Sequence, residues 1–458
     1  MPSAPTMTTA KAFAPVMWLM PMVVLLFVSA ISLAQETGRS PDVKSTLYLH
    51  ATLIDTDRGV VRPNTSLLVR GAYIQAVDAN ELRGASDVSA VDLQGKYVLP
   101  GLINTHVHLA VGRPDPILAR AYLRRELYSG VTTVRDMADD ARMLGELKRE
   151  ATFDEIESPD IYYVALMAGP SFFTDPRSHD AALGFEPGTA PWMRSITQSS
   201  DLRQIIAEAR GTGATAIKIY ADLPPAMVSA LTAEAHRQGL LVWAHAAVFP
   251  AGPMDVIRAG VDVVSHAAFL AYQLAPQIPP SLTEMSALNE HGDFDGPVMR
   301  AIYQEMKDRG TILDATVDVT YKHPWKVFPP SVVSAVTAAA HHHGVMVSAG
   351  TDDDPDWSDP DSALVGEIVR LVESAGFTPM DALKAATIVA ARTVGQQNAV
   401  GKLETGYAAD FVVLKDNPLD NIQNVRSVEF VVKHGISHMR KAYEPFRPNP
   451  SASKARSQ

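Results

Sequence analysis

The chain of 458 residues contains no cysteine. Disulfide bonds and thiolate metal ligands are therefore excluded, and redox arguments neither support nor oppose export of the protein. Basic residues are also outnumbered, 40 against 51 acidic residues, and the formal net charge of -11 argues against a nucleic-acid partner. The sequence has no phosphate-binding glycine loop, no dinucleotide fingerprint and no internal repeat.

The composition is that of a soluble globular enzyme, because 47% of the residues are hydrophobic and 20% are charged. The length suffices for one large barrel and one small additional domain. Composition leaves the oligomeric state open, and a homo-oligomer is one option.

An N-terminal leader over residues 1–34 has the features of a signal peptide. Lys11 precedes an apolar stretch, and the Ser-Leu-Ala sequence at 32–34 supplies the cleavage-type positions. We therefore expect a periplasmic or secreted protein. The stretch is also long enough to span a bilayer, so an uncleaved membrane anchor is the alternative. Pro15 and Pro21 argue mildly against a regular spanning helix.

Eight short apolar runs with the composition of strands alternate with helical patterns along most of the chain. Near-continuous apolar strands that alternate with helices are typical of parallel sheets buried on both faces. The sequence therefore predicts an α/β fold, a (β/α)8 TIM barrel over residues 101–395. The eight runs lie at 102–109, 131–137, 161–167, 216–221, 240–246, 261–267, 311–317 and 345–352, and the clearest helices at 117–128, 202–209, 225–237, 298–307 and 332–341.

Six polar residues lie at or near the C-terminal ends of these strands, on the face where such barrels carry their chemistry. His106 and His108 are two residues apart, so on a strand both imidazoles point to one face. Neutral imidazole ligands suit a first-row divalent cation. A single buried histidine is more often an ordinary core residue, but the joint pattern favours a metal site. The six residues are His106, His108, Lys218, His245, His266 and Asp352.

These residues stand in motifs that resemble the metal-dependent amidohydrolase superfamily, and within it the imidazolonepropionase-like and Xaa-dipeptidase-like branch. A lone HxH motif would be a weak signal, but the order and spacing of all five motifs are specific. The motifs are HVH (106–108), AIKIY (216–220), WAHA (243–246), SHAAF (265–269) and AGTDDD (349–354), supported by VLPGLINTHVH (98–108), GVTTVRDM (130–137) and GKLETGYAADFVVL (401–414).

The resemblance implies two divalent metal ions, zinc in the first place, with manganese or cobalt as alternatives. One ion would be held by His106, His108 and Asp352, and the other by His245 and His266. A carbamate on Lys218 would bridge the two ions. The residues themselves agree with this, because a lysine within an apolar strand is pushed toward its neutral amine, and a neutral amine can take up carbon dioxide.

The resemblance further implies cleavage of a C–N bond in a small-molecule substrate, a dipeptide or an N-acyl amino acid, through attack by a metal-bridging hydroxide. Asp352 would also carry the proton to the departing amine. Hydrolysis of a cyclic amide, an amidine or a lactone is the alternative reaction. An inactive barrel that acts as a binding protein is the alternative of another class.

Tyr220 shares the strand face of Lys218 and could hydrogen-bond the oxyanion, or it could simply fill the barrel mouth. The loop at 172–191 is long enough to be a lid or a substrate wall. Arg177, His179 and Trp192 are its expected substrate contacts. The aspartates that follow Asp352 are interpreted as a solvated acidic loop, one member of which could support the site; they are Asp353, Asp354, Asp356, Asp359 and Asp361.

The two ends of the chain show short β-like runs broken by turn residues. In the family these ends fold together, so we expect a composite β-sandwich domain over 44–100 and 396–442. The segment at 443–458 is rich in proline, serine and basic residues and is expected to be disordered.

Overall fold

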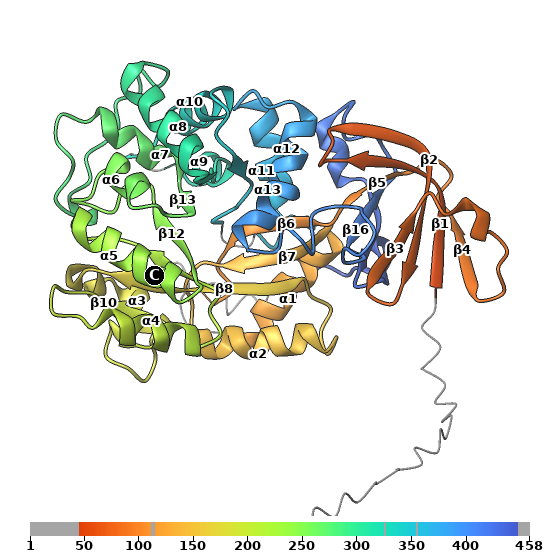
Figure 1. The fold of residues 1–458 in the computed structure, drawn as a ribbon, viewed down its shortest axis with the longest axis horizontal. Helices are drawn as coiled ribbons and strands as arrows, with labels where there is room; N and C mark the ends of the chain where they lie inside the picture. Colours follow the sequence, from red (N-terminus) through yellow and green to blue (C-terminus); the bar gives the residue numbers. More distant parts are fainter. Residues whose placement is uncertain (1–44, 111–114, 325–326, 354–355, 448–458) are drawn as a thin grey trace, which may run out of the picture. The chain divides into compact units, whose positions relative to one another are not determined.

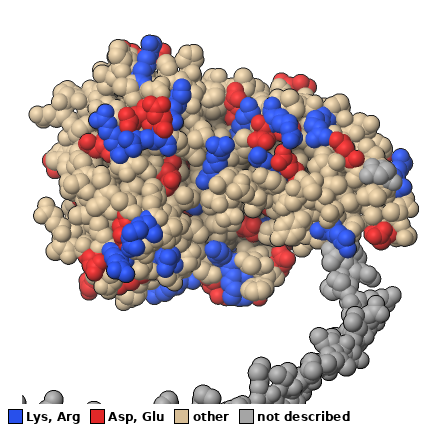
Figure 2. Space-filling view, viewed as in Figure 1, with Lys and Arg blue, Asp and Glu red and all other residues tan. Residues whose placement is uncertain are grey.

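The computed structural model describes residues 45–110, 115–324, 327–353 and 356–447 (Figure 1). The expected leader at 1–34 lies outside these ranges and stays a prediction. None of the helices in the described part of the chain is long and apolar enough to cross a membrane. On the face shown in Figure 2, basic and acidic side chains lie interspersed over the surface.

Eight parallel strands form the barrel, in chain order, as the sequence predicts. The barrel is nearly closed, and residues just after the last strand bridge it to the first: Asp352 N donates to His106 O at 2.9 Å and Ala349 O accepts from Thr105 N at 3.3 Å. The strands are β6 (Leu102–Val107), β7 (Val131–Asp136), β8 (Asp160–Ala168), β11 (Ala216–Ile219), β12 (Leu241–His245), β13 (Val263–Ser265), β14 (Ile312–Asp314) and β15 (Val347–Ser348).

Helices follow the barrel strands and surround them (Figure 1). Several begin with proline in the first turn, where the missing N–H costs nothing, and α8 ends at Gly310 in the left-handed conformation that favours glycine. The longer helices are α1 (Pro116–Tyr128), α2 (Ala141–Thr152), α4 (Leu202–Gly211), α5 (Pro225–Arg237), α8 (Pro297–Arg309), α10 (Pro330–His342) and α11 (Ala363–Glu373). Shorter ones are α6 (Pro253–Arg258), α7 (Ala267–Leu270), α9 (Asp318–Lys322), α12 (Pro379–Ala385) and α13 (Ile388–Thr393).

The segment after β8 is more ordered than a loop. It contains α3 (Pro176–Ala181), capped by the Asp175 carboxylate, and two short strands, β9 (Thr189–Ala190) and β10 (Met193–Ser195). β10 pairs in parallel with β8 and so extends the barrel sheet at one point. The interpretation of 172–191 as a plain loop missed these elements because each is only two to six residues long.

The two chain ends fold together, as expected, and their strands form one mixed sheet, in which β5 pairs with β1 on one side and β16 on the other. The strand order is β18-β17-β16-β5-β1-β2-β3, and β4 pairs with β1. Tyr48, Leu53 and Phe411 lie in its apolar core. The strands are β1 (Ser45–Asp55), β2 (Val60–Arg70), β3 (Tyr73–Val77), β4 (Val88–Asp92), β5 (Tyr97–Pro100), β16 (Phe411–Leu414), β17 (Val428–Lys433) and β18 (Ile436–Met439).

The tail expected to be disordered from residue 443 begins with packed residues. The Tyr443 ring stacks on Tyr128 at 5.3 Å between centroids, and the Phe446 ring meets Trp357 at 5.0 Å. Residues 448–458 lie outside the described part, so the prediction for them remains open.

A charged cluster joins the mixed sheet to the base of the barrel. Asp160, at the start of β8, accepts from Lys433 Nζ at 2.9 Å and pairs with His434 Nε2 at 3.0 Å. Asp410 accepts from the backbone N–H of His434. Asp160, Asp410 and His434 are close enough to share a metal ion, but the buried ammonium of Lys433 already supplies a cation there.

The Asp160 pair raises the pKa of His434 above its ordinary value of 6.5. A raised folded-state pKa gives stability that is fully present below the ordinary pKa of the unfolded chain and is lost as the pH rises through the folded-state pKa. His434→Asn keeps a residue that tolerates the positive φ of 48° and removes the imidazole. We expect the variant to be less stable than the wild type by about 1 kcal/mol near pH 5.5, and the gap to shrink near pH 9. Thermal melting at both pH values measures this, and an equal gap at both would contradict it.

Candidate metal centre

Asp352 lies at the centre of the candidate site. Its Oδ1 is 3.3 Å from His106 Nε2 and 3.3 Å from His108 Nε2, and its Oδ2 is 3.7 Å from His266 Nδ1. Its backbone has a φ of 49°, a conformation that costs energy for a non-glycine residue and persists where the surroundings impose it. The hydrogen bond from Asp352 N to His106 O is one such constraint, and it directs the carboxylate toward the histidines.

The histidines converge on this carboxylate from different strands. His106 and His108 share one face of the barrel mouth, with ring centroids 5.5 Å apart. His266 follows β13 with a φ of 68°, and its ring lies 5.1 Å from that of His106 and 4.9 Å from that of His245. One ligand atom each of His106, His266 and Asp352 lies within 4.8 Å of the others, close enough to hold one metal ion.

Lys218 and His245 line the same cavity, and both residues are buried. Burial lowers the pKa of Lys218 to about 8, although Asp352 and Asp314 oppose the shift. Among the described residues, Lys218 Nζ has no hydrogen bond or ion pair, and His245 Nδ1 has no hydrogen-bond partner. Buried polar atoms without partners are costly, so this donor set fits a site that receives cations.

The protonation states of Asp352 and the histidines are set by their burial and by their short distances from one another. Burial raises the pKa of Asp352, but His106, His108 and His266 outweigh it and hold the pKa well below its usual range. Burial also holds the pKa of His245 and His266 well below their usual value, so their rings are neutral near pH 7. Asp139 and Asp352 outweigh the burial of His108 and raise its pKa to about 10, so this imidazole must lose its proton when a metal ion binds. A carboxylate together with imidazoles is a donor set that binds divalent metals.

Sequence reasoning missed the residues that hold these rings. Asp314, fully buried at the end of β14, accepts from His106 Nδ1 at 2.7 Å and from Thr105 Oγ1 at 2.9 Å. The His106 proton is therefore on Nδ1, and Nε2 is left to face Asp352. Thr316 Oγ1 lies 2.9 Å from His266 Nδ1. An aspartate in the middle of the otherwise largely apolar run 311–317 was the available signal for Asp314.

A cavity of about 690 Å³ opens above the centre. Much of its wall is apolar, and aromatic rings reach the metal-ligand candidates. The Tyr220 ring lies 4.1 Å from that of His245 and 4.6 Å from that of Phe172, and Phe269 lies 5.0 Å from His245. Burial raises the pKa of the Tyr220 phenol, against the opposing charge of Arg177. Tyr220 therefore stays protonated near neutral pH and can donate a hydrogen bond into the cavity.

The structure brings one of the three expected substrate contacts to the cavity. Arg177, on α3, lines it. His179 is exposed and is not part of the lining. Trp192 is buried beside the cavity, where its Nε1 donates to Ala181 O at 2.8 Å and its ring packs on Phe185 and Arg142.

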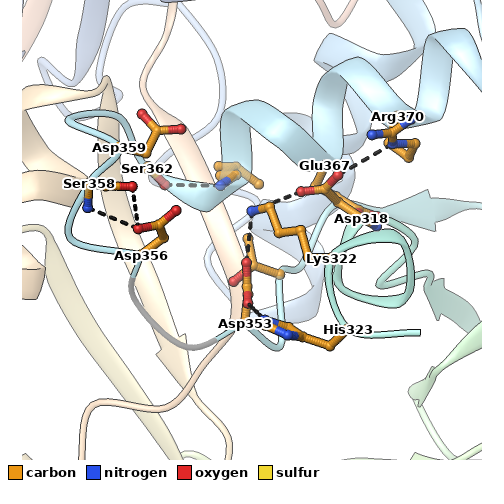
Figure 3. Close-up of polar contacts among 12 residues, drawn as sticks. Asp318, Lys322, His323, Asp353, Asp356, Ser358, Asp359, Ser362, Glu367 and Arg370 are labelled. Carbon is orange, nitrogen blue, oxygen red and sulfur yellow. Dashed lines mark hydrogen bonds and ion pairs between the residues drawn. The ribbon is translucent and has the colours of Figure 1, made fainter. Parts of the chain in front are cut away.

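The interpretation of Asp353 as a solvated residue is wrong. Its side chain is only 3% exposed and accepts from Lys322 Nζ at 2.8 Å, and His323 Nε2 lies 3.2 Å from its other oxygen (Figure 3). Asp352 and Asp353 are consecutive, and only Asp352 contacts the metal-ligand candidates His106, His108 and His266. Asp356 and Asp359 are exposed, as expected, and Asp354 lies outside the described residues. Asp361 is not solvated as expected, because its side chain is largely buried in ion pairs with Arg426 and Arg440.

Fold and site define a class of protein, a (β/α)8 barrel with a candidate metal centre at the C-terminal ends of its strands. A model of the amidohydrolase family matches residues 97–437, and the chain belongs to that family. The sequence is 28% identical to ochratoxinase of Aspergillus niger over 233 residues, 47% of this chain but only 42% of that protein. It is 24% identical to imidazolonepropionase of Chromobacterium violaceum over 406 residues, 81% of this chain and 91% of that protein.

Solved structures agree on the fold. The crystal structure of a Xaa-Pro dipeptidase with bound methionine in the active site matches with a TM-score of 0.68, at 21% identity, and covers 86% of this chain and 100% of that one. At this identity the likeness establishes the barrel and its added sheet.

Asp314→Asn tests whether the missed carboxylate orients His106. An asparagine has nearly the same shape but can accept only one of the two hydrogen bonds that Asp314 receives. Loss of such a supporting hydrogen bond weakens metal binding by roughly ten- to a hundredfold. Metal titration with a competing chelator measures the affinity, and Asp356→Asn is the control. Unchanged affinity would show that Asp314 has only a packing role.

Proposed function

We propose that this protein is a binuclear metal-dependent hydrolase that cleaves the C–N bond of a dipeptide or an N-acyl amino acid. The observation that carries the proposal is the convergence of three histidines on the Asp352 carboxylate, beside a buried lysine that forms no hydrogen bond or ion pair in the described chain. Membership of the amidohydrolase family supports a hydrolase acting on C–N bonds. The likeness to a Xaa-Pro dipeptidase supports a dipeptide among these substrates.

His106, His108 and Asp352 would hold one metal ion, His245 and His266 the other, and Lys218, as a carbamate, would connect the two. Bound there, the ions, zinc in the first place, would activate water and polarise the amide carbonyl. Lys218 suits this role because its lowered pKa leaves more neutral amine available for carbon dioxide than at an exposed lysine.

The chain's own groups account for the remaining chemistry. Asp352 is ionised near neutral pH, so it can accept a proton and pass it to the departing amine. Tyr220 remains protonated and can donate to the oxygen on which negative charge develops. Asp314 fixes the tautomer of His106, and the apolar cavity wall limits water around the reacting groups.

The N-terminal leader supports a further proposal, that the protein is exported to the periplasm or secreted. An uncleaved anchor would keep it at the membrane instead. Mass spectrometry of the protein from its native host distinguishes the two, since cleavage predicts an N-terminus at or near Gln35.

The reaction is tested with metal-reconstituted protein and a panel of dipeptides, N-acyl amino acids, cyclic amides and lactones. We expect turnover of dipeptides or N-acyl amino acids, and its loss on treatment with a chelator. Turnover confined to lactones or cyclic amides would replace the proposed substrate class. Absence of bound metal after gentle purification and reconstitution would point to a binding protein.

Lys218→Ala removes the amine that would carry the bridging carbamate, so we expect bound metal and turnover to fall together. Added formate or acetate should restore part of both, because a small carboxylate can fill the vacated bridge. Metal content by mass spectrometry and kcat are the measurements, and the exposed Lys415→Ala is the matched control. A Lys218→Ala protein with two metals and normal turnover would show that the binuclear assignment is wrong.

Tyr220→Phe removes the phenol and leaves the ring packing nearly unchanged. If the phenol donates to the developing oxyanion, kcat falls by roughly tenfold to a thousandfold while KM moves little. Tyr272→Phe, which removes a buried phenol that donates to Ser286 O away from the cavity, should leave kcat unchanged. A kcat within about twofold of wild type would leave Tyr220 as a packing residue only.

A further inference from the structure

One wall of the cavity comes from the segment that follows β14. Val319 and Thr320 of α9, with His323 and Phe328 after it, line the cavity. The Phe328 ring lies 4.9 Å from Phe269, and Phe269 lies 5.0 Å from His245. The wall therefore continues a row of aromatic rings that starts at a metal-ligand candidate. We call the four cavity-lining residues Val319, Thr320, His323 and Phe328 the α9 wall.

The α9 wall is tied to the residue next to Asp352. Lys322, the last residue of α9, places its Nζ 2.8 Å from Asp353 Oδ2 and 3.0 Å from Asp318 Oδ2. His323 Nε2 lies 3.2 Å from the other Asp353 oxygen. Figure 3 shows Asp353 between Lys322 and His323. One buried carboxylate thus holds two consecutive residues at the end of α9.

A second set of contacts fixes the start of α9 from α11. The buried Glu367 carboxylate accepts from Val317 N at 3.1 Å and from Asp318 N at 2.7 Å. Arg370 Nε donates to Asp318 Oδ1 at 3.3 Å (Figure 3). With its start held by Glu367 and its end held by Asp353, α9 has a defined position above the metal-ligand candidates.

The burial of Asp353 indicates that its contacts with Lys322 and His323 are structurally important. Its side chain is 3% exposed, and a buried carboxylate is stable only when it is paired and hydrogen-bonded. Asp356, further along the same acidic stretch, is exposed, and within the described residues its side chain accepts hydrogen bonds from Ser358 alone. Asp353 therefore differs from the exposed Asp356 in being buried and in contacting Lys322 and His323 at the end of α9.

We propose that the α9 wall recognises a bulky apolar group, such as an aromatic ring, next to the scissile bond, and that Asp353 is the positioning residue that fixes this wall. Val319 and Phe328 make the α9 wall partly apolar, and the lining beside it adds Phe269, Leu282 and Met285, so this part of the cavity suits an apolar ligand group. The link to a scissile amide rests on the proposed function. Burying an aromatic group against such a wall improves binding by roughly tenfold to a hundredfold over a methyl group.

The test compares N-benzoyl-L-phenylalanine with N-acetyl-L-alanine on the metal-loaded enzyme. The wild type should show a kcat/KM at least about tenfold higher for the benzoyl compound. Asp353→Asn should raise KM for the benzoyl compound about tenfold and leave kcat, metal content and the KM of the acetyl compound within about twofold. Asp356→Asn is the matched control and should behave as the wild type.

Lys322→Met removes the other partner of the ion pair with Asp353, so it should also reduce the preference for the benzoyl compound. The double variant with Asp353→Asn should be no worse than either single variant, because both remove one interaction. An Asp353→Asn protein that retains the full preference overturns the positioning role. Equal damage to both substrates with loss of metal also overturns it, since Asp353 would then act on the metal centre and not on the wall.

Binding of uncleavable amines separates this inference from the proposed reaction. N-benzyl-L-phenylalanine and N-ethyl-L-alanine replace the amide carbonyl by a methylene group. Both are secondary amines with one carboxylate, so the two compounds carry the same charges as each other. Calorimetry on the metal-loaded enzyme should give a Kd at least about tenfold lower for the benzyl compound, and Asp353→Asn should abolish the difference. This result without amide hydrolysis would refute the proposed function and retain the wall. Equal binding of both amines by the wild type would refute the wall.

Discussion

The structure depends on placing ionisable side chains together where little water reaches them. The Asp352 carboxylate lies 3.3 Å from two imidazoles and 3.7 Å from a third, at the end of a barrel whose strands are otherwise apolar. Burying such groups is costly unless they are paired with one another or with an ion. Among the described residues, His245 Nδ1 has no hydrogen-bond partner and Lys218 forms no hydrogen bond or ion pair at the same place, so the arrangement has ligand atoms that cations could occupy.

Much of the surrounding structure keeps these groups in position. Asp314 holds His106, and Thr316 lies within hydrogen-bond distance of His266. The closure of the barrel between its first and last strands passes through the backbone of Asp352 and His106 themselves. Metal-ligand candidates and barrel closure therefore share the same residues. The next residue, Asp353, contacts Lys322 and His323 and so connects the candidate site to the α9 wall of the cavity.

The barrel could be predicted because its strands are apolar on both faces and alternate with helices, and this pattern survives in the sequence alone. The convergence of His106 and Asp352 could be inferred because parallel strands end at one face. Side chains in the segment after β8 could not be placed in this way. Arg177 reaches the cavity, whereas Trp192 is turned into the protein by its hydrogen bond to Ala181, and nothing in the local sequence distinguishes these outcomes.

Asp353 shows a second limit of sequence reasoning. In a run of aspartates each residue has the same local pattern, and the difference arises from Lys322, thirty-one residues earlier in the chain. Asp314 was missed for a related reason, since its partner His106 is 208 residues away. Long-range pairing decides which carboxylates are buried, and one sequence contains no direct record of it.

Anomalous X-ray diffraction from crystals of the protein loaded with zinc tests the central claim most directly. We expect two anomalous peaks at the C-terminal mouth of the barrel, one beside His106, His108 and Asp352 and the other beside His245 and His266. Extra density on Lys218 Nζ should lie between them. A single peak with an unmodified Lys218, or zinc bound at other residues, would contradict the account.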